Sequence, residues 1–164
     1  MTALRRTLFL VFLLVLSTIG FASAQQDIVG VASVIDGDTI EIHGQRIRLH
    51  GIDTPESRQL CVRPNGERWR CGQQASLALA DQIGRATVRC KPRNIDRYRR
   101  VVAVCFKGNE DLNRWMVANG WAVAYRRYSV DYVADEDAAR RKRLNMWSGA
   151  FEMPWDWRTQ RQNR

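Results

Sequence analysis

The sequence predicts an α+β domain, mainly β, in which a small five-stranded β-barrel is flanked by three α-helices. Short β-branched runs are separated by turn dipeptides, helical periodicity begins after the third run, and two further helical stretches follow the fifth. Because such short strands cannot cover both faces of an open sheet, closure with a capping helix is the expected way to bury side chains such as Val31, Ile40 and Ile47.

Five runs rich in Val and Ile are expected to form the strands. The first three lie at 27–35, 39–42 and 45–52, and they are separated by Asp-Gly and His-Gly dipeptides that favour tight turns. The last two are expected at 86–92 and 100–106, joined by a polar loop. This order predicts a meander followed, after a helix, by one more hairpin.

Three stretches have the features of helices. Residues 70–84 carry apolar side chains at helical spacing and end in Gly84, a common helix stop. Residues 110–120 begin with acids and also end in Gly, and 135–149 is acidic first and basic later, as the helix dipole favours. The tail after this point has two Trp but little periodicity, and is expected to pack loosely.

The N-terminus has the composition of an export signal. Arg5 and Arg6 precede the apolar run 8–19, and small residues end at Ala24, where a signal peptidase would cut. The run is short for a membrane span, which needs about 20 residues. Cleavage after Ala24 is therefore expected, with an uncleaved membrane anchor as the alternative.

These features divide the chain into three parts. We expect a signal peptide at 1–24, a single folded domain at 25–150 and a C-terminal tail at 151–164. The length after cleavage suits one domain with a sizeable core. An exported chain would be secreted or periplasmic, with no membrane contact after the signal is removed, and we expect it to be a monomer.

The chain is strongly basic, with 26 Lys and Arg against 17 Asp and Glu and a formal net charge of +9. Such a balance suits a polyanionic partner, either nucleic acid or an anionic surface. Simple solubility is the alternative interpretation, and charge alone does not separate the two. The choice between them depends on the motifs.

Four cysteines in an exported chain predict two disulfides. Three pairings are possible, and we favour Cys61 with Cys71 and Cys90 with Cys105 because each pair brackets a local loop or hairpin. A zinc site is the competing interpretation. It is disfavoured because the chain has no CxxC spacing and only two histidines.

Two short segments concentrate acids in this basic chain: DGD at 36–38 and DTPES at 53–57. Taken singly, each is explained by turn chemistry, since acids beside turns are usually solvated. If 39–42 and 45–52 form an antiparallel hairpin, however, Asp38 begins one strand and Asp53 follows the other, so the two carboxylates meet. Without a cation they would repel, and oxygen ligands suit Ca²⁺ or Mg²⁺.

Arg48 lies on the strand that delivers Asp53. A cation held by acids and flanked by guanidinium groups is what phosphodiester hydrolysis requires, because charge gathers on the phosphoryl oxygens. Glu56, three residues after Asp53, is placed to activate or orient a water molecule. These residues indicate a metal-dependent phosphodiesterase.

Four segments, VIDGDTI, RLHGIDTPES, DRYRR and KRLNMWS, resemble the staphylococcal nuclease (thermonuclease) family in order and spacing. The likeness covers roughly Ile28 to Ser148. It implies an OB-type five-stranded barrel with three helices. It also implies a calcium-dependent endonuclease that hydrolyses DNA and RNA to 3′-phosphate products.

The resemblance also assigns roles to individual residues. The family's calcium ligands fall on Asp38, Asp53 and the backbone carbonyl of Thr54. Its two phosphate-stabilising arginines fall on Arg48 and Arg100. These implied roles agree with the chemistry that the acidic segments indicate by themselves.

Three further residues complete the implied site. The water-orienting glutamate falls on Glu56, and the nucleotide-contacting tyrosines fall on Tyr98 and Tyr125, the second across a one-residue gap. The family usually has Gly where this chain has Arg99. In an extended segment side chains alternate, so Tyr98 and Arg100 should share a face that excludes Arg99.

Two other classes of function compete with an enzyme. A barrel of this type often binds nucleic acid without cutting it, so a non-catalytic OB-fold module is the main alternative. A non-catalytic binding module would not need acids that repel phosphate, whereas this chain has them. The second alternative is a calcium-binding structural protein, which would not explain the presence of Arg48 and Arg100.

Overall fold

The computed structural model describes residues 26–162. The predicted signal peptide and its cleavage site after Ala24 lie outside the described residues. Within this range, no helix is both long and apolar enough to cross a bilayer.

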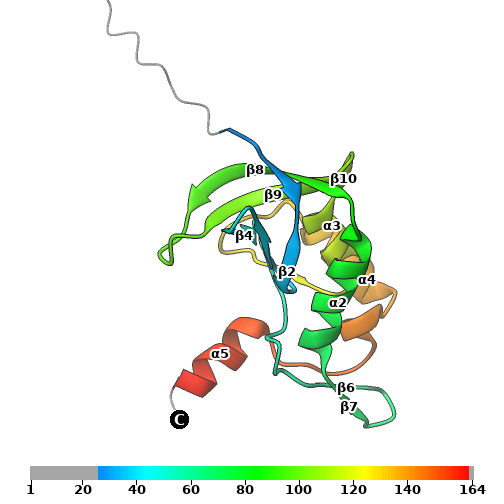
Figure 1. Cartoon of the computed structure of the whole chain (residues 1–164). Coiled ribbons are helices and arrows are strands. Elements are labelled where there is room, and N and C mark those ends of the chain that lie inside the picture. The colour runs from blue at the N-terminus through cyan, green and yellow to red at the C-terminus, as the bar shows by residue number, and fades with distance from the viewer. Residues whose placement is uncertain (1–25, 163–164) are drawn as a thin grey trace, which may run out of the picture.

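The main sheet curls on itself, with strands in the order β1-β8-β9-β4-β3-β2 (Figure 1). Its strands are β1 (Ile28–Val31), β2 (Ser33–Asp36), β3 (Thr39–Ile42), β4 (Gln45–Leu49), β8 (Thr87–Ile95) and β9 (Val101–Lys107), and β10 (Glu110–Asp111) pairs with β9. The ends of the order, β1 and β2, are consecutive in the chain and separated only by Ala32. The first predicted strand is therefore one bent strand that contributes to both ends of the sheet, as in an OB-like barrel. The predicted fold class is confirmed.

Two short antiparallel pairs extend the barrel. Strand β5 (Ile52–Asp53) pairs with β11 (Val123–Ala124), and β6 (Cys61–Val62) pairs with β7 (Arg68–Trp69). The first pair places Val123 directly opposite Asp53. It therefore connects the acidic segment to a part of the chain some 70 residues further on.

The described residues form four α-helices where the sequence predicted three. They are α2 (Cys71–Ile83), α3 (Leu112–Ala118), α4 (Val133–Arg141) and α5 (Pro154–Gln162), with a short 3₁₀ helix, η1 (Asn145–Ser148), between the last two. Helices α2, α3 and α4 gather on one side of the sheet, whereas α5 stands apart at the lower left of Figure 1.

Two predictions about the C-terminal third were wrong. The expected helix at 135–149 ends at Arg141, because Arg143 and Asn145 have φ angles of 51° and 43°, in the left-handed region that a helix cannot continue through. The tail, expected to lack regular structure, forms α5. It starts with Pro154 at the first helical position and has Asp156 in its first turn, both favourable at a helix N-terminus.

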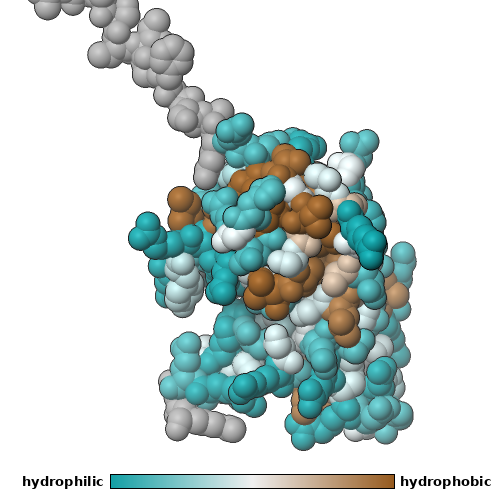
Figure 2. Space-filling view, in the orientation of Figure 1, coloured by the Kyte–Doolittle hydropathy of each residue, from teal (hydrophilic) through white to brown (hydrophobic). Residues whose placement is uncertain are grey.

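The core fills the space between the curled sheet and helices α2 and α3. Ile40 and Ile47 are fully buried in it, as expected. The prediction for Val31 was wrong, because this side chain is 64% exposed. Figure 2 shows hydrophobic side chains over β1 and β2 on this face, and Val29, Val31 and Ile35 of these strands are exposed.

The two disulfides are those favoured from the spacing. Cys61 pairs with Cys71, which joins β6 to the start of α2, and Cys90 pairs with Cys105 across β8 and β9. The described residues contain no free cysteine. One bridge therefore lies beside the segment that follows the acids, and the other lies inside the barrel.

Candidate active site

The β3–β4 hairpin brings Asp38 and Asp53 together on one guanidinium group. Asp38 directly precedes β3, and Thr39 lies opposite Arg48 in the antiparallel register. The Leu49 amide donates to the Asp38 carbonyl at 2.8 Å, which extends the pairing to the end of the hairpin. Arg48 then donates from Nη1 to Asp38 at 2.9 Å and from Nη2 to Asp53 at 2.8 Å.

Both acids lie in a poorly solvated environment, with exposed fractions of 4% for Asp38 and 0% for Asp53. Burial raises the pKa of Asp38 to about 6, and Asp36 adds to the shift while Arg48 opposes it. Burial likewise raises the pKa of Asp53, against the hydrogen bond from Arg158. Burial therefore disfavours the charged form of both carboxylates, and a bound cation would favour it.

Close backbone approaches hold the loop around these acids. The Thr54 amide donates to Asp38 Oδ2 at 3.3 Å, which ties the two acidic segments together. A Cβ at Gly37 would lie 2.8 Å from Thr54 Oγ1, and one at Gly72 would lie 1.9 Å from the carbonyl oxygen of Glu56. Position 72 therefore requires glycine, because its neighbour is backbone, whereas a side chain at Gly37 would force the Thr54 side chain to move. At Gly72 the first turn of α2 packs directly on the backbone that presents Glu56.

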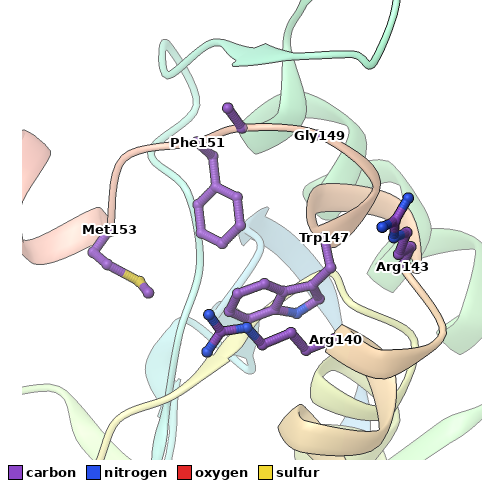
Figure 3. A pocket seen from close by; sticks show the side chains of 7 residues that line it. Arg140, Arg143, Trp147, Gly149, Phe151 and Met153 are labelled. Atoms are coloured by element: carbon purple, nitrogen blue, oxygen red, sulfur yellow. The ribbon is translucent and has the colours of Figure 1, made fainter.

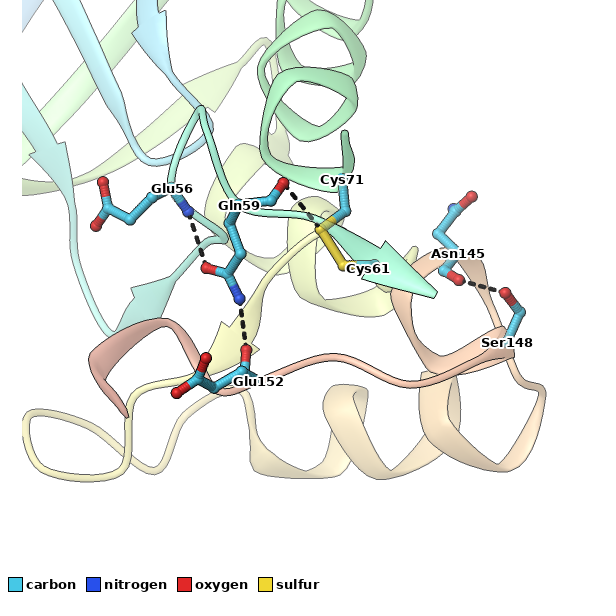
Figure 4. Close-up of a disulfide and its surroundings, with 7 residues drawn as sticks. All are labelled: Glu56, Gln59, Cys61, Cys71, Asn145, Ser148 and Glu152. Carbon is cyan, nitrogen blue, oxygen red and sulfur yellow. Dashed lines mark hydrogen bonds between the residues drawn. A yellow bond between two sulfur atoms is a disulfide. The ribbon is translucent and has the colours of Figure 1, made fainter. Parts of the chain in front are cut away.

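Gln59 is a buried residue that the sequence interpretation missed. Its side-chain oxygen accepts from the Glu56 amide at 3.2 Å, and its side-chain nitrogen donates to the Glu152 carbonyl at 2.6 Å (Figure 4). The Cys71 sulfur lies 3.6 Å from the Gln59 carbonyl oxygen. Gln59 thus connects the catalytic candidate Glu56 to both the disulfide and the C-terminal segment.

Arg158, on α5, is the second residue that the sequence interpretation missed. Its Nη2 donates to Asp53 Oδ2 at 2.7 Å, and its Nη1 donates to Asp53 Oδ1 at 3.1 Å and to Glu56 Oε1 at 2.8 Å. Burial would lower the pKa of Arg158, but Asp53 and Glu56 raise it. Its position 105 residues from Asp53, in a segment without apolar periodicity, left no signal in the sequence.

Tyr125 lies beside the acids because of the β5–β11 pair. Its amide donates to the Gly51 carbonyl at 2.8 Å, just beyond the Val123–Asp53 pairing. The ring stacks on Trp155 of α5, with centroids 5.3 Å apart and an interplanar angle of 11°. The structure therefore brings the second predicted tyrosine to the same side as Arg158.

Tyr98 and Arg100 lie in the turn between β8 and β9, and the expectation of an extended segment was wrong. The Arg99 amide donates to the Asp96 carbonyl at 2.9 Å, and Arg99 has a φ of 65°, where glycine is favoured. The Arg100 guanidinium pairs with Asp96 at 2.8 Å and lies 5.5 Å from the centre of the Tyr98 ring.

Arg100 lies in the turn immediately before β9, and Val102 of β9 is opposite Arg48 in the parallel β4–β9 pair. Among residues 26–162, Arg100 makes no hydrogen bond or ion pair with Asp38, Asp53 or Glu56. Within this range, the structure therefore does not bring Arg100 and the exposed Tyr98 into contact with these acids.

The donor set fits a hard divalent cation better than zinc. Asp38 and Asp53 offer charged oxygens, and Thr54, whose carbonyl is the third predicted ligand, lies in the same loop with its amide on Asp38. In the part of the chain that the structure describes, all cysteines are in disulfides, and no three His, Cys, Asp or Glu side chains form a metal-binding cluster. Two protein carboxylates, a carbonyl and waters are a plausible shell for Ca²⁺ but leave soft metals without ligands.

A surface pocket of about 430 Å³ lies elsewhere, beside the end of α4 and the segment that leads to α5 (Figure 3). Arg140, Arg143, Trp147, Phe151 and Met153 line it, with Gly149 and Ala150. No predicted site residue lines this pocket. The predicted acids Asp38 and Asp53 meet on Arg48 at the end of the β3–β4 hairpin instead.

Comparison with known proteins identifies related chains. Residues 46–149 match the family described as Staphylococcal nuclease homologue. A micrococcal nuclease of Shigella flexneri is 34% identical over 151 residues, which covers 81% of this chain and 81% of that protein. An uncharacterized endonuclease of Haemophilus influenzae is 29% identical over 164 residues, covering 95% of this chain and 86% of that protein.

A third relative shares a shorter region. The succinoglycan biosynthesis protein ExoI of Rhizobium meliloti is 43% identical over 104 residues, which is 62% of this chain. The match spans 54% of that protein, so this chain corresponds to about half of its length.

Proposed function

Because the chain belongs to the staphylococcal nuclease family, we propose that it is a Ca²⁺-dependent endonuclease that hydrolyses DNA and RNA to 3′-phosphate products. The observation that carries this proposal is the convergence of Asp38 and Asp53 on Arg48. Buried acids and a largely buried guanidinium are costly to hold together for stability alone, since each charge loses hydration. Their chemistry suits a reaction in which a cation and an anionic phosphate enter together.

Each residue has a specific task in this proposal. Asp38, Asp53 and the Thr54 carbonyl would hold the cation. When bound, Ca²⁺ would neutralise charge on the phosphoryl oxygens and orient a water molecule. Arg48 and Arg100 would donate to the phosphate as negative charge gathers on it in the transition state.

Glu56 would accept the proton of the attacking water, because its backbone is fixed by Gln59 while its side chain remains partly exposed. Tyr98 and Tyr125 would contact the nucleotide on either side. Neither aromatic ring distinguishes ribose from deoxyribose, which agrees with a substrate range that includes both nucleic acids.

The signal-like composition of residues 1–24 and the two disulfides support a location outside the cytoplasm. We propose that cleavage after Ala24 releases one mature chain, made of a domain at 25–150 and a C-terminal segment at 151–164. This chain would act as a monomer and would be secreted or stay in the periplasm. Two disulfides among the described residues suit an oxidising compartment.

Incubation of the oxidised protein with plasmid DNA and with RNA, in Ca²⁺ or in excess chelator, tests the proposal. We expect cleavage of both substrates in Ca²⁺ only, and its loss in Asp53→Asn. Asp27→Asn is the matched control, because Asp27 is an exposed acid that pairs with Arg89 at 3.3 Å, away from the site. Binding of nucleic acid without cleavage in Ca²⁺ would instead support the non-catalytic OB-fold module.

A further inference from the structure

Helix α5 covers both halves of the proposed site. Arg158 contacts both carboxylate oxygens of Asp53, and one of these, Oδ1, also accepts from Arg48. Asp53 therefore has no oxygen that is free of a guanidinium donor. A cation that takes Asp53 as a ligand would have to lie beside the Arg158 guanidinium, which donates to both oxygens of this carboxylate.

Arg158 is the arginine that can leave. Arg48 is 18% exposed and stands on β4, which is paired on both sides by β3 and β9. Arg158 is 31% exposed and stands on a terminal helix. A divalent cation on Asp53 would also repel the guanidinium beside it, because like charges a few ångströms apart repel strongly where water is scarce.

The second contact of α5 lies on the nucleotide side. Trp155 stacks in parallel on Tyr125, the arrangement that a base would adopt on a tyrosine. Trp155 and Arg158 are three residues apart and so lie on one side of the helix. One face of the helix thus places the Trp155 ring on Tyr125 and the Arg158 guanidinium on Asp53 and Glu56.

The attachment of α5 to the barrel lies before the helix begins. Ala150 and Val62 exchange backbone hydrogen bonds at 2.8 and 2.9 Å, and the Glu152 carbonyl accepts from Gln59 (Figure 4). Beyond this backbone attachment, Pro154 is buried and Trp155 packs against a second cluster of buried hydrophobic side chains, whereas Arg158 is held by its contacts to Asp53 and Glu56. Few buried residues therefore oppose movement of the helix away from the site while its anchor stays in place.

We propose that α5 is an autoinhibitory strap, in which Arg158 takes the place of the cation and Trp155 the place of a base. This inference rests on the proposed function, because it takes Asp53 as a metal ligand and Tyr125 as a nucleotide contact. Binding of Ca²⁺ and nucleotide displaces the strap. The free protein therefore keeps its buried acids neutralised and its site closed until both ligands are present.

A different role for Arg158, as a third donor to the phosphate, predicts the opposite behaviour. In its present position Arg158 donates to both oxygens of Asp53 and to Glu56, so it opposes metal binding and holds the proposed base. As a phosphate donor it would stay on the site and would be ordered by ligand. The two roles are separated by the measurements below.

Calorimetric titration with Ca²⁺ alone is the first measurement. We expect Arg158→Gln to bind Ca²⁺ at least about tenfold more tightly than the wild type, since a competing charge-assisted contact is removed. Arg161→Gln is the matched control, because Arg161 is also on α5 but lies over the Trp157 ring, 4.3 Å from its centre. We expect its affinity to be unchanged. Equal or weaker binding by Arg158→Gln would overturn the strap.

Hydrogen exchange of the wild-type protein is the second measurement and does not depend on any variant. With Ca²⁺ and a deoxynucleoside 3′-phosphate as the probe, amides of 154–162 should exchange faster than in the free protein, while those of the β3–β4 hairpin should exchange more slowly. Slower exchange in α5 would show that the helix closes on the ligand, and would contradict displacement.

Asp53→Asn separates failure of this inference from failure of the proposed function. If the wild type binds Ca²⁺ and Asp53→Asn does not, the metal site stands, and an unchanged affinity in Arg158→Gln overturns the strap alone. If neither the wild type nor Arg158→Gln binds Ca²⁺, both proposals fall.

Discussion

Asp53 receives one arginine from the barrel and one from the C-terminal segment, and the two regions differ in how firmly they hold it. Arg48 is fixed by strands on both sides and by Asp38 as well as Asp53. Arg158 comes from a helix whose covalent and hydrogen-bonded anchor precedes it. The same kind of ion pair is therefore preorganised in one case and removable in the other.

This difference shows how a buried carboxylate can be paired in the free protein and still become available to bind a cation. Local opening in proteins starts from segments with few buried contacts, and α5 has only Pro154 buried. The barrel half of the site can remain unchanged while the helical half opens. Substitutions in the barrel should therefore affect catalysis most, and those elsewhere should affect it less.

The largest effects are expected from the acids of the barrel. Asp38→Asn and Asp53→Asn should each reduce Ca²⁺-dependent cleavage to background, because each removes a charged ligand from a site that has only two. Initial rates at saturating Ca²⁺ measure this, with circular dichroism to check the fold. Near-wild-type rates in either variant would remove that acid from the metal site.

Next in size are the two proposed phosphate-stabilising arginines. Arg48→Ala and Arg100→Ala should each lose about 10²–10³ in turnover, the usual effect of removing one preorganised charge-stabilising donor. Arg99→Ala should mainly weaken binding and flatten its salt dependence, as loss of a diffuse phosphate contact does. Turnover at saturating DNA and binding at several salt concentrations separate these outcomes. A large turnover defect in Arg99→Ala alone would mean that the site is shifted by one residue.

Removal of each disulfide should separate an effect on stability from an effect on the geometry of the site. Replacing either cysteine pair by serine should lower the free energy of unfolding by about 3 kcal/mol. Only Cys61→Ser with Cys71→Ser should also lower the turnover of the folded protein, because that bridge adjoins Gln59 and, through it, Glu56. Denaturant unfolding and turnover below the transition measure the two effects. Equal turnover in both double variants would show that the bridge does not position Glu56.

The smallest effect is expected at Arg99. Arg99→Gly should raise the free energy of unfolding by about 1 kcal/mol, because glycine adopts a φ of 65° without the steric cost of a side chain. Turnover should stay unchanged, since the Arg99 side chain has no task at the acids. Arg99→Ala, which keeps the strain, is the control. Loss of stability in Arg99→Gly would contradict the left-handed assignment.

The barrel half of the site was predictable because its interactions are local. Asp38, Arg48 and Asp53 lie within one hairpin, so turn dipeptides and strand alternation were enough to bring them together. The turn at 96–100 was harder to predict from the sequence. Its left-handed residue is an arginine where glycine would have signalled the bend, so an extended segment was assumed.

The C-terminal half was not predictable for a physical reason. Helix α5 is stabilised by contacts that reach Asp53 and Tyr125, far away in the sequence, and not by an apolar stripe of its own. Pro154 and Asp156 are helix-start signals, but without periodicity they do not identify a helix. Gln59 was missed likewise, since its partners are backbone groups brought together only by the fold.

A crystal structure of the wild-type protein with Ca²⁺ and a deoxynucleoside 3′-phosphate tests the account most directly. We expect Ca²⁺ bound by carboxylate oxygens of Asp38 and Asp53, Arg48 close to the phosphate, and Arg158 no longer in contact with Asp53. Ca²⁺ bound at another place, or Arg158 still on both oxygens of Asp53 with the nucleotide present, would contradict it.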